Sequence, residues 1–257
     1  MNRPADRPGP FEGLHNFRDL GSLPTTDGRV VAQGRVYRSD ALHRMTAADV
    51  AQVAGLGVRT VVDLRAPDEV AHVGVGRIPE LGATYHNLPV RPTVLSDPTG
   101  ADAPVAAAPS AAEHYVRYLT EGPTCFRGVV ELFTAPDATP AVFFCNAGKD
   151  RTGAVAAMLL TVLGVDDATI AADYARTQSA LAGIGAATIR DYPPDVARWR
   201  GLSPDLAHAR EETMLDFLAL VRERVGGWER YLEGLGVTTE RLDALRAACL
   251  EEQGPSR

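Results

Sequence analysis

The chain has 257 residues, of which 45% are hydrophobic and 23% are charged, a balance typical of a globular protein of one or two domains. Its formal net charge of -7 argues against a nucleic-acid-binding surface. The three cysteines (Cys125, Cys145 and Cys249) are odd in number and few for this length. They indicate a reducing compartment rather than a disulfide framework.

The first ten residues, MNRPADRPGP, are polar and rich in proline. We expect them to form a flexible tail before a single domain over residues 11–257. They lack the apolar segment of a secretion signal, and the most apolar stretch, residues 153–165, is too short to cross a bilayer. The sequence therefore predicts a cytoplasmic protein that does not insert stably into a membrane.

Four short runs that are β-branched or alternate apolar with polar residues predict strands: residues 35–42, 59–65, 83–90 and 139–145. Between the first two, residues 46–57 have the apolar spacing of a helix, with Thr46 as N-cap and Gly57 at the C-terminal end. Later helices are predicted at residues 110–122, 124–136, 151–164, 166–181, 211–227, 228–236 and 237–253.

Strands that alternate with helices predict an α/β fold with a central, mostly parallel sheet flanked by helices. The helices after residue 151 predict a helical C-terminal elaboration. Residues 91–110 predict a long irregular loop, and proline-broken residues within about 179–210 suggest a lid. Ligands of such sheets bind beyond the carboxyl ends of the strands, which favours a site at residues 145–151.

The segment FFCNAGKDRTG, residues 143–153, joins the last predicted strand to the apolar helix. It resembles a nucleotide-binding loop only superficially. A Walker A loop requires G-x-x-x-x-G-K-[ST], but Phe143 replaces the first glycine and Asp150 follows Lys149. The missing glycine and hydroxyl exclude that class.

A cysteine-based phosphate site explains the same residues better. Loop amides and the following helix N-terminus can bind a phosphate dianion and keep Cys145 as a thiolate. Arg151 can grip two phosphoryl oxygens, and Gly148 allows the turn between them. Thr152 can donate its hydroxyl to the thiolate when the sulfur leaves. These donors predict a reaction that needs no metal, in which a phosphocysteine forms and is hydrolysed.

CNAGKDRTG resembles the signature of Cys-dependent protein-tyrosine phosphatases. More narrowly, it is similar to that of atypical bacterial tyrosine and phosphoinositide phosphatases with the loop C-x-A-G-K-D-R-T-G. The resemblance extends to residues 16–23, 34–42, 56–65, 172–178 and 212–237. It implies a mostly parallel sheet with helices on both sides and a helical lid after the loop helix.

The resemblance implies roles at the matching positions. Cys145 would be the nucleophile, Arg151 the phosphate clamp and Asp150 the general acid. Lys149 would suit substrates with a second phosphate, and Asp63 would lie near the mouth of the site. Phosphate would be bound by Asn146, Ala147, Gly148, Lys149 and Thr152.

Several of these positions have a second interpretation. Asp150 could cap the helix, and Asp97 and Asp102 in the long loop are competing acids. Asp63 could pair with Arg65. Arg18 could likewise pair with Asp19, although we expect Asp63, Arg18 and Asp19 to support the site. Cys125 and Cys249 are interpreted as packing residues.

Phe144 departs from the family pattern, which has a histidine immediately before the nucleophile. Phenylalanine cannot donate the hydrogen bonds by which that histidine orders the loop, so we expect weakened activation of the thiol. The function predicted is metal-independent hydrolysis of a phosphate monoester through a cysteinyl-phosphate intermediate.

The substrate class has several interpretations. A phosphotyrosine protein, a phosphoinositide or a small phosphomonoester would be the substrate. One alternative is a metabolic phosphatase acting on a nucleotide, sugar or inositol phosphate. The other is a regulatory module that binds phosphate with little turnover. No metal or cofactor is predicted, because the six histidines lack metal-ligand spacing such as H-E-x-x-H.

Overall fold

The computed structural model describes residues 10–90, 110–192 and 204–253. Its main sheet has five strands in the order β1-β3-β6-β4-β5. They comprise Arg18–Asp19 (β1), Val36–Ser39 (β3), Ala141–Phe144 (β6), Thr60–Asp63 (β4) and Thr84–Asn87 (β5). All neighbours pair in parallel except β1, which is antiparallel to β3. The predicted α/β fold with a mostly parallel sheet is confirmed.

Strand β6 is central, and its register brings three strand ends together. Phe144 is opposite Ser39 of β3 on one side and Asp63 of β4 on the other. All four residues of β6 are fully buried, which suits the run Ala-Val-Phe-Phe to the middle of a parallel sheet. The segments that follow β3, β6 and β4 therefore all start at the carboxyl ends of these parallel strands.

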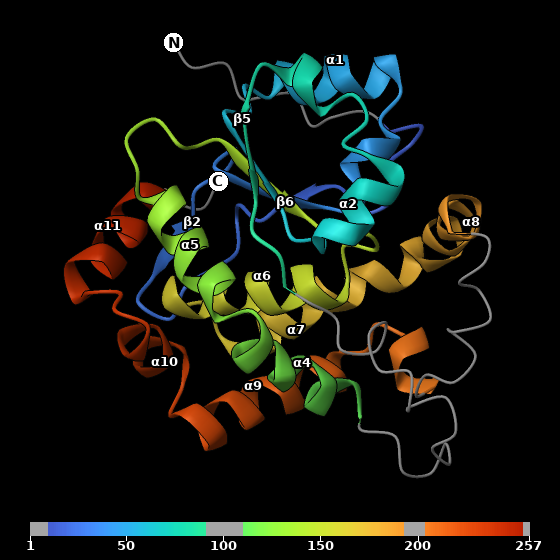
Figure 1. Ribbon diagram of the computed structural model, residues 1–257. Helices are drawn as coiled ribbons and strands as arrows, with labels where there is room; N and C mark the ends of the chain where they lie inside the picture. Colours follow the sequence, from blue (N-terminus) through green and yellow to red (C-terminus); the bar gives the residue numbers. More distant parts are fainter. Residues whose placement is uncertain (1–9, 91–109, 193–203, 254–257) are drawn as a thin grey trace.

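One face of the sheet is covered by two helices and two short 3₁₀ turns. They are Leu42–Arg44 (η1), Ala47–Gly55 (α1), Pro67–Val73 (α2) and Ile78–Leu81 (η2). Thr46 forms a capping box with Asp49 at the start of α1, as its position before the apolar stripe predicts. Figure 1 shows α1 and α2 together on this side of the sheet.

The other face is covered by a larger helical layer. Its helices are Ala111–Glu121 (α4), Pro123–Phe133 (α5), Asp150–Val162 (α6), Asp167–Ala175 (α7), Glu211–Val225 (α9), Trp228–Gly234 (α10) and Thr239–Cys249 (α11). Helix α6 is buried along most of its length, because it lies between the sheet and the outer helices (Figure 1). The predicted helical C-terminal elaboration is confirmed.

Two predicted helices were wrong at their ends. Residues 166–181 are not one helix: α7 stops at Ala175, a 3₁₀ turn follows, and a separate helix α8 covers Leu181–Asp191. The helix predicted for residues 237–253 ends at Cys249. Leu250–Glu252 (β7) instead pairs antiparallel with Arg29–Val31 (β2), a partner that lies far away in the sequence.

Several sequence predictions fall on residues outside the described ones. These include nearly all of the tail at 1–10, almost the whole loop at 91–110 and the centre of the lid at about 179–210. Of that lid, α8 and the 3₁₀ turn Pro204–Ala207 (η7) are described. Within the described residues, no helix is both long and apolar enough to cross a membrane.

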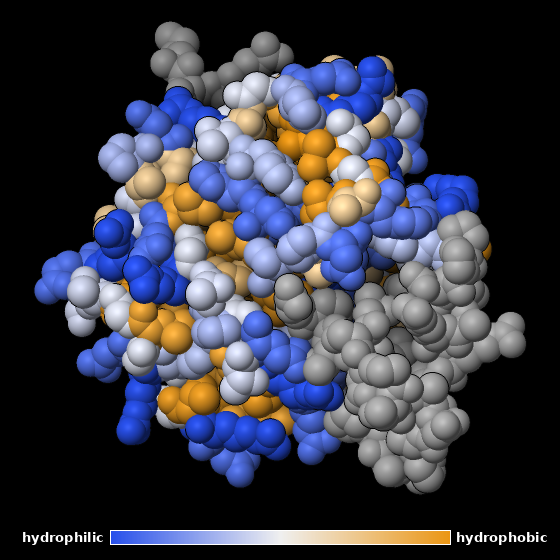
Figure 2. Space-filling view, viewed as in Figure 1, coloured by the Kyte–Doolittle hydropathy of each residue, from blue (hydrophilic) through white to orange (hydrophobic). Residues whose placement is uncertain are grey.

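The face of the molecule drawn in Figure 2 is mainly hydrophilic. Figure 2 shows polar side chains over most of one face, with hydrophobic residues in separate patches. Among the described residues, Ile189 and Leu215 are the large hydrophobic side chains classed as exposed. The apolar residues of the sequence are therefore used mainly in the two cores on either side of the sheet.

Candidate active site

The loop between β6 and α6 turns sharply at one glycine. Gly148 has φ +65°, and a Cβ there would lie 2.5 Å from the Ser39 carbonyl oxygen and 2.7 Å from the Asp40 amide nitrogen. Only glycine fits this close approach with a left-handed backbone. The loop is thus pressed against the end of β3, with the buried Cys145 directly after β6.

The amides and carbonyls of this loop have different surroundings. Among the described residues, no amide from 146 to 151 has a hydrogen-bond acceptor. The carbonyl oxygen of Asn146 accepts from the Ala41 amide at 3.2 Å, and the carbonyls of Ala147 and Gly148 accept from side chains. Consecutive amides left with free donors beside a helix N-terminus form an anion-binding arrangement.

Arg151 is held by a carboxylate that the sequence did not reveal. Its Nη2 donates to Glu69 Oε1 at 3.0 Å and its Nη1 to Glu69 Oε2 at 2.5 Å. Glu69 in turn accepts from the Ala66 amide at the start of α2. Burial opposes charge on Arg151, but Glu69 and then Cys145 raise the pKa of the guanidinium well above its usual value. Arg151 is therefore a fixed cation near the sulfur.

Glu69 occupies only part of the guanidinium. An arginine has five N–H donors, and the two bonds to Glu69 use two of them. Three donors remain without a partner among the described residues. The ion pair therefore sets the orientation of Arg151 and leaves donors available for phosphoryl oxygens.

Thr152 carries a buried hydroxyl with an unusual lack of partners. Its side chain is fully buried, and its Oγ1 has no hydrogen-bond partner among the described residues. Such an atom normally costs free energy unless it serves a ligand or a reaction. The next residue, Gly153, lets α6 pack closely against Tyr174, because a Cβ there would be 3.1 Å from that ring.

Asp150 is the first residue of α6 rather than its N-cap. Lys149 holds the cap position, and no side chain in the described part of the chain caps this helix. The Tyr115 hydroxyl, itself 2.7 Å from that of Tyr174, donates to Asp150 Oδ1 at 2.5 Å. The capping interpretation of Asp150 is therefore wrong.

Lys149 contacts protein groups in the described structure. Its Nζ donates to the Leu206 carbonyl oxygen and, at 3.2 Å, to that of His208. It also lies 3.2 Å from Asp150 Oδ1. The lysine thereby joins the loop to η7, through Leu206, and to His208 just after it.

Asp63 lies at the end of β4 and is fully buried. It accepts from Arg65 Nη2 at 2.6 Å and from the Tyr85 hydroxyl at 2.9 Å. The Arg65 guanidinium lies over the Phe144 ring, 5.3 Å from its centroid. The structure thus contains the Asp63–Arg65 pair. Phe144 packs beneath this arginine and, being apolar, gives the loop no hydrogen bond from its side chain.

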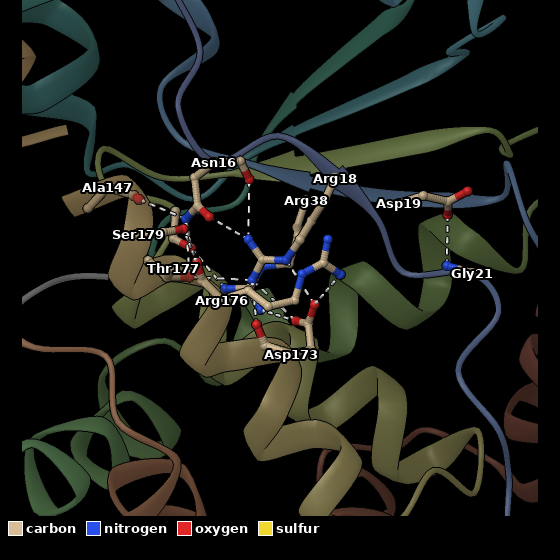
Figure 3. Close-up of polar contacts among 11 residues, drawn as sticks. Asn16, Arg18, Asp19, Gly21, Arg38, Ala147, Asp173, Arg176, Thr177 and Ser179 are labelled. Atoms are coloured by element: carbon tan, nitrogen blue, oxygen red, sulfur yellow. Dashed lines mark hydrogen bonds and ion pairs between the residues drawn. The ribbon is translucent and has the colours of Figure 1, made fainter. Parts of the chain in front are cut away.

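Arg18 and Asp19 do not pair with each other. Arg18 donates to Asp173 Oδ1 at 2.8 Å, whereas Asp19 accepts from the amides of Gly21 at 2.8 Å and Gly34 at 2.7 Å. Figure 3 shows Arg18 within a polar cluster and Asp19 apart from it, beside Gly21. Asp19 links the segment just after β1 to the segment just before β3. Arg18 belongs to a cluster that reaches the loop.

The sequence interpretation missed six residues that contact the loop or each other: Asn16, Arg38, Arg44, Glu69, Tyr115 and Asp173. Of these, Arg44 donates through Nη2 to Asn146 Oδ1 at 2.9 Å. Three of them lie in segments already matched to the family, 16–23, 34–42 and 172–178. Glu69 and Tyr115 lie in ordinary amphipathic helices, where no local pattern singles them out. The competing acids Asp97 and Asp102 lie outside the described residues. No group of three or more metal-ligating side chains is present within the described part of the chain.

Comparison with known proteins identifies the class of protein. Residues 9–251 match the model of the tyrosine phosphatase family, so the chain belongs to that family. The confirmed fold and the phosphatase-like loop agree with this membership. The chain is accordingly a phosphoric monoester hydrolase of the protein-tyrosine phosphatase type.

Three relatives resemble the chain over much of its length. The triple specificity protein phosphatase PtpB of Mycobacterium tuberculosis is 29% identical, over 93% of this chain and 97% of the relative. A tyrosine-protein phosphatase of Nostoc commune is 30% identical, over 87% of this chain and 76% of the relative. A putative tyrosine-protein phosphatase of Cupriavidus necator, H16_A0669, is 35% identical, over 64% of this chain and 60% of the relative.

One solved structure also matches. The core catalytic domain of the PP-IP phosphatase SIW14 from S. cerevisiae, in complex with citrate, has 14% identity and a TM-score of 0.35. The match covers 62% of this chain and 76% of that one. A likeness of this degree carries no argument about substrate or mechanism.

Proposed function

We propose that the protein hydrolyses phosphate monoesters through a phosphocysteine on Cys145, without a metal ion. The observation that carries the proposal is the loop after β6. Its consecutive amides have no acceptors among the described residues, and they lie next to a buried cysteine and an arginine oriented by Glu69. These groups supply the donors and the positive charge that a phosphoryl group needs during transfer.

In the first step, the Cys145 thiolate attacks phosphorus and the bond from phosphorus to the ester oxygen breaks. Asp150 supplies the proton for the departing oxygen. Amides of residues 146–151 and the remaining donors of Arg151 bind the three other phosphoryl oxygens. Asp150 is suited to this role because it lies at the start of α6 and its side chain is partly exposed.

In the second step, a water attacks phosphorus and the phosphorus–sulfur bond breaks. Asp150, now a carboxylate, accepts the proton of that water, and the sulfur leaves as a thiolate. The hydroxyl of Thr152, which has no partner in the described structure, can donate to that thiolate. Thr152→Ala should slow this step more than the first, which would let the phosphocysteine accumulate.

The first test is turnover of p-nitrophenyl phosphate with EDTA present. We expect hydrolysis by the wild-type protein and none by Cys145→Ser. Turnover that survives Cys145→Ser would contradict the nucleophile assignment. Binding of vanadate without any turnover would instead support a phosphate-binding regulatory module.

The role of Asp150 is tested separately with Asp150→Asn. Loss of a general acid typically costs about 10²–10⁴-fold in rate. The loss should be larger for alkyl phosphates, whose leaving groups need protonation, than for activated aryl phosphates. Equal losses on the two classes would mean that proton donation is not the main role of Asp150.

We propose phosphotyrosine in proteins as the main substrate class, because the family and two of the relatives are named for tyrosine phosphatase activity. A panel of phosphotyrosine, phosphoserine and phosphothreonine peptides, phosphoinositides, nucleotides and sugar phosphates tests this. The highest kcat/KM should be for phosphotyrosine peptides. A higher value for a nucleotide or sugar phosphate would indicate a metabolic phosphatase.

A further inference from the structure

A buried polar cluster lies against the loop and comes from three separate parts of the chain. It contains Asn16, Arg18 of β1, Arg38 of β3 and Asp173 of α7. Asp173 accepts from Arg18 at 2.8 Å through Oδ1 and from Arg38 at 2.8 Å through Oδ2. Figure 3 shows the two guanidinium groups converging on this carboxylate, with Asn16 between them and Ala147.

The cluster donates hydrogen bonds to the carbonyl side of the loop. Asn16 Nδ2 lies 3.2 Å from the Ala147 carbonyl oxygen and 3.0 Å from that of Gly148, and Arg38 Nη2 lies 2.8 Å from the same Gly148 oxygen. In a planar trans peptide, the N–H points away from the preceding C=O. Fixing these two carbonyls therefore points the amides of Gly148 and Lys149 away from the cluster.

The side chain of Asn16 is itself held in one orientation. Its Oδ1 accepts from Arg18 Nη1, and its backbone amide donates to Asp40 Oδ1 at 3.1 Å. Its Nδ2 has a third acceptor, Thr177 Oγ1, at 3.3 Å. Because Arg18 occupies the oxygen, the amide group of Asn16 can present only its nitrogen to the loop.

The cluster also carries an excess positive charge. Two guanidinium groups share the single carboxylate of Asp173. Burial and then Arg18 lower the pKa of Arg38 to about 10, so Arg38 stays protonated at neutral pH. A buried cation beside the loop favours any anion bound on its amide side. Arg176, 3.7 Å from Asp173, adds a further, more exposed cation.

We propose that Asn16 and Arg38, held by Arg18 and Asp173, are positioning residues that fix the Ala147 and Gly148 carbonyls and thereby aim the loop amides at the phosphoryl group. The inference rests on the proposed function of the loop. These residues supply donors that Phe144, an apolar side chain beneath Arg65, cannot supply. The cluster acts on the reaction through the loop rather than by touching the substrate.

The test uses the full chain with two shape-preserving variants, Asn16→Leu and Asn16→Asp. Both remove the donor, and only the second adds a negative charge. Arg38→Lys keeps a charge but has one terminal nitrogen in place of the two that contact Asp173 and the Gly148 carbonyl. The matched control is Leu245→Ala, which should lower stability because Leu245 is a fully buried residue of α11, a helix that packs on α5.

Three quantities are measured for each variant: kcat and KM for p-nitrophenyl phosphate, affinity for inorganic phosphate, and the pH of half-ionisation of the thiol from thiolate absorbance. Cys145→Ser serves as the blank for the absorbance. Both Asn16 variants should lose about 10²-fold in kcat/KM, bind phosphate more weakly and ionise the thiol at higher pH. Arg38→Lys should lose about tenfold. Leu245→Ala should melt at lower temperature with these quantities unchanged.

Wild-type values in Asn16→Leu would overturn the proposal, since that variant lacks the donor. A loss in Asn16→Asp alone would also overturn it, because charge rather than the hydrogen bond would then be responsible. If the wild-type protein shows no turnover that depends on Cys145, the proposed function fails. Phosphate affinity and thiol ionisation still decide on the positioning role in that case.

Discussion

At the scale of single residues, Arg151 shows how the site is prepared before phosphate binds. A buried guanidinium without a counter-ion is costly, and Glu69 supplies that counter-ion with two hydrogen bonds. Burial works against the Glu69 carboxylate, yet Arg151 holds its pKa below the usual value. The pair stabilises the folded protein and simultaneously orients donors toward the loop.

Glu69→Gln should show how far the folded protein depends on a counter-ion for Arg151. We expect a loss of about 3 kcal/mol in the free energy of unfolding, because the guanidinium is left buried without its counter-charge. Vanadate should then raise the melting temperature of the variant more than that of the wild type, because the bound anion restores a partner for Arg151. Calorimetry with and without vanadate measures both effects. Unchanged stability in the absence of vanadate would contradict this account of Arg151.

Gly148 gives a second prediction at this scale. In Gly148→Ala, the new Cβ would meet the Ser39 carbonyl at 2.5 Å on a backbone with positive φ, so the loop must shift. A displacement of this kind should lower kcat/KM about 10²-fold while the protein still folds. Steady-state kinetics measures the loss.

The matched control for Gly148→Ala is Gly55→Ala at the end of α1, where an added Cβ meets nothing within 4 Å. It should leave kcat/KM unchanged and raise stability by about 0.5–1 kcal/mol. Full activity in Gly148→Ala would show that the loop tolerates a different path and does not need the close approach to β3.

At the scale of elements, a histidine whose side chain is only 7% exposed joins η1 to the end of α8. His43 Nε2 lies 3.0 Å from Asp191 Oδ2, and its Nδ1 lies 2.9 Å from Arg65 Nη1. Burial and then Arg65 lower the pKa of His43 from 6.5 to about 4, although Asp191 opposes this shift. The folded protein therefore holds His43 neutral at neutral pH.

A depressed histidine pKa sets the direction of a pH effect on stability. The unfolded chain takes up this proton near pH 6.5, whereas the folded protein resists it down to about pH 4. Stability from neutral His43 is thus complete above pH 6.5 and lost as the pH falls toward 4. The loss is on the order of 3 kcal/mol. Denaturant unfolding should show a shallower decline in His43→Gln, and identical slopes would refute the assignment.

The elements also show what the sequence can and cannot predict. The four parallel strands were predictable because runs rich in β-branched and aromatic residues carry a local signal, and Thr46 was predictable as a cap. Strand β7 was not, because residues 250–252 pair with β2 more than 200 positions earlier. No local pattern in their own sequence encodes that partner.

The residues of the candidate site likewise fall into those that the sequence could predict and those that it could not. Cys145, Gly148 and Arg151 occur within one short motif, so their association was predictable from spacing. Glu69 was not, because it reaches Arg151 only through the fold, across 82 positions of the chain. Its own surroundings in the sequence look like an ordinary helix start, in which an acidic residue is common.

At the scale of the whole molecule, the central strand β6 places Cys145 at the carboxyl end of the sheet. Helices from the layers on both faces of the sheet contact the loop that begins there. Segments distant in sequence then act on the same loop: β3 limits its path at Gly148, α2 orients Arg151 through Glu69, and α4 reaches Asp150 through Tyr115. The fold thus converts a short motif into a site whose groups are fixed from several directions.

The central claim is that phosphate passes through the sulfur of Cys145. The most direct measurement is a rapid acid quench of the enzyme during turnover of p-nitrophenyl phosphate, followed by mass spectrometry of the peptide containing residue 145. We predict the added mass of one phosphoryl group on Cys145, more of it in Thr152→Ala and none in Cys145→Ser. Turnover at the full rate with no phosphorylated Cys145 at any quench time would contradict the account.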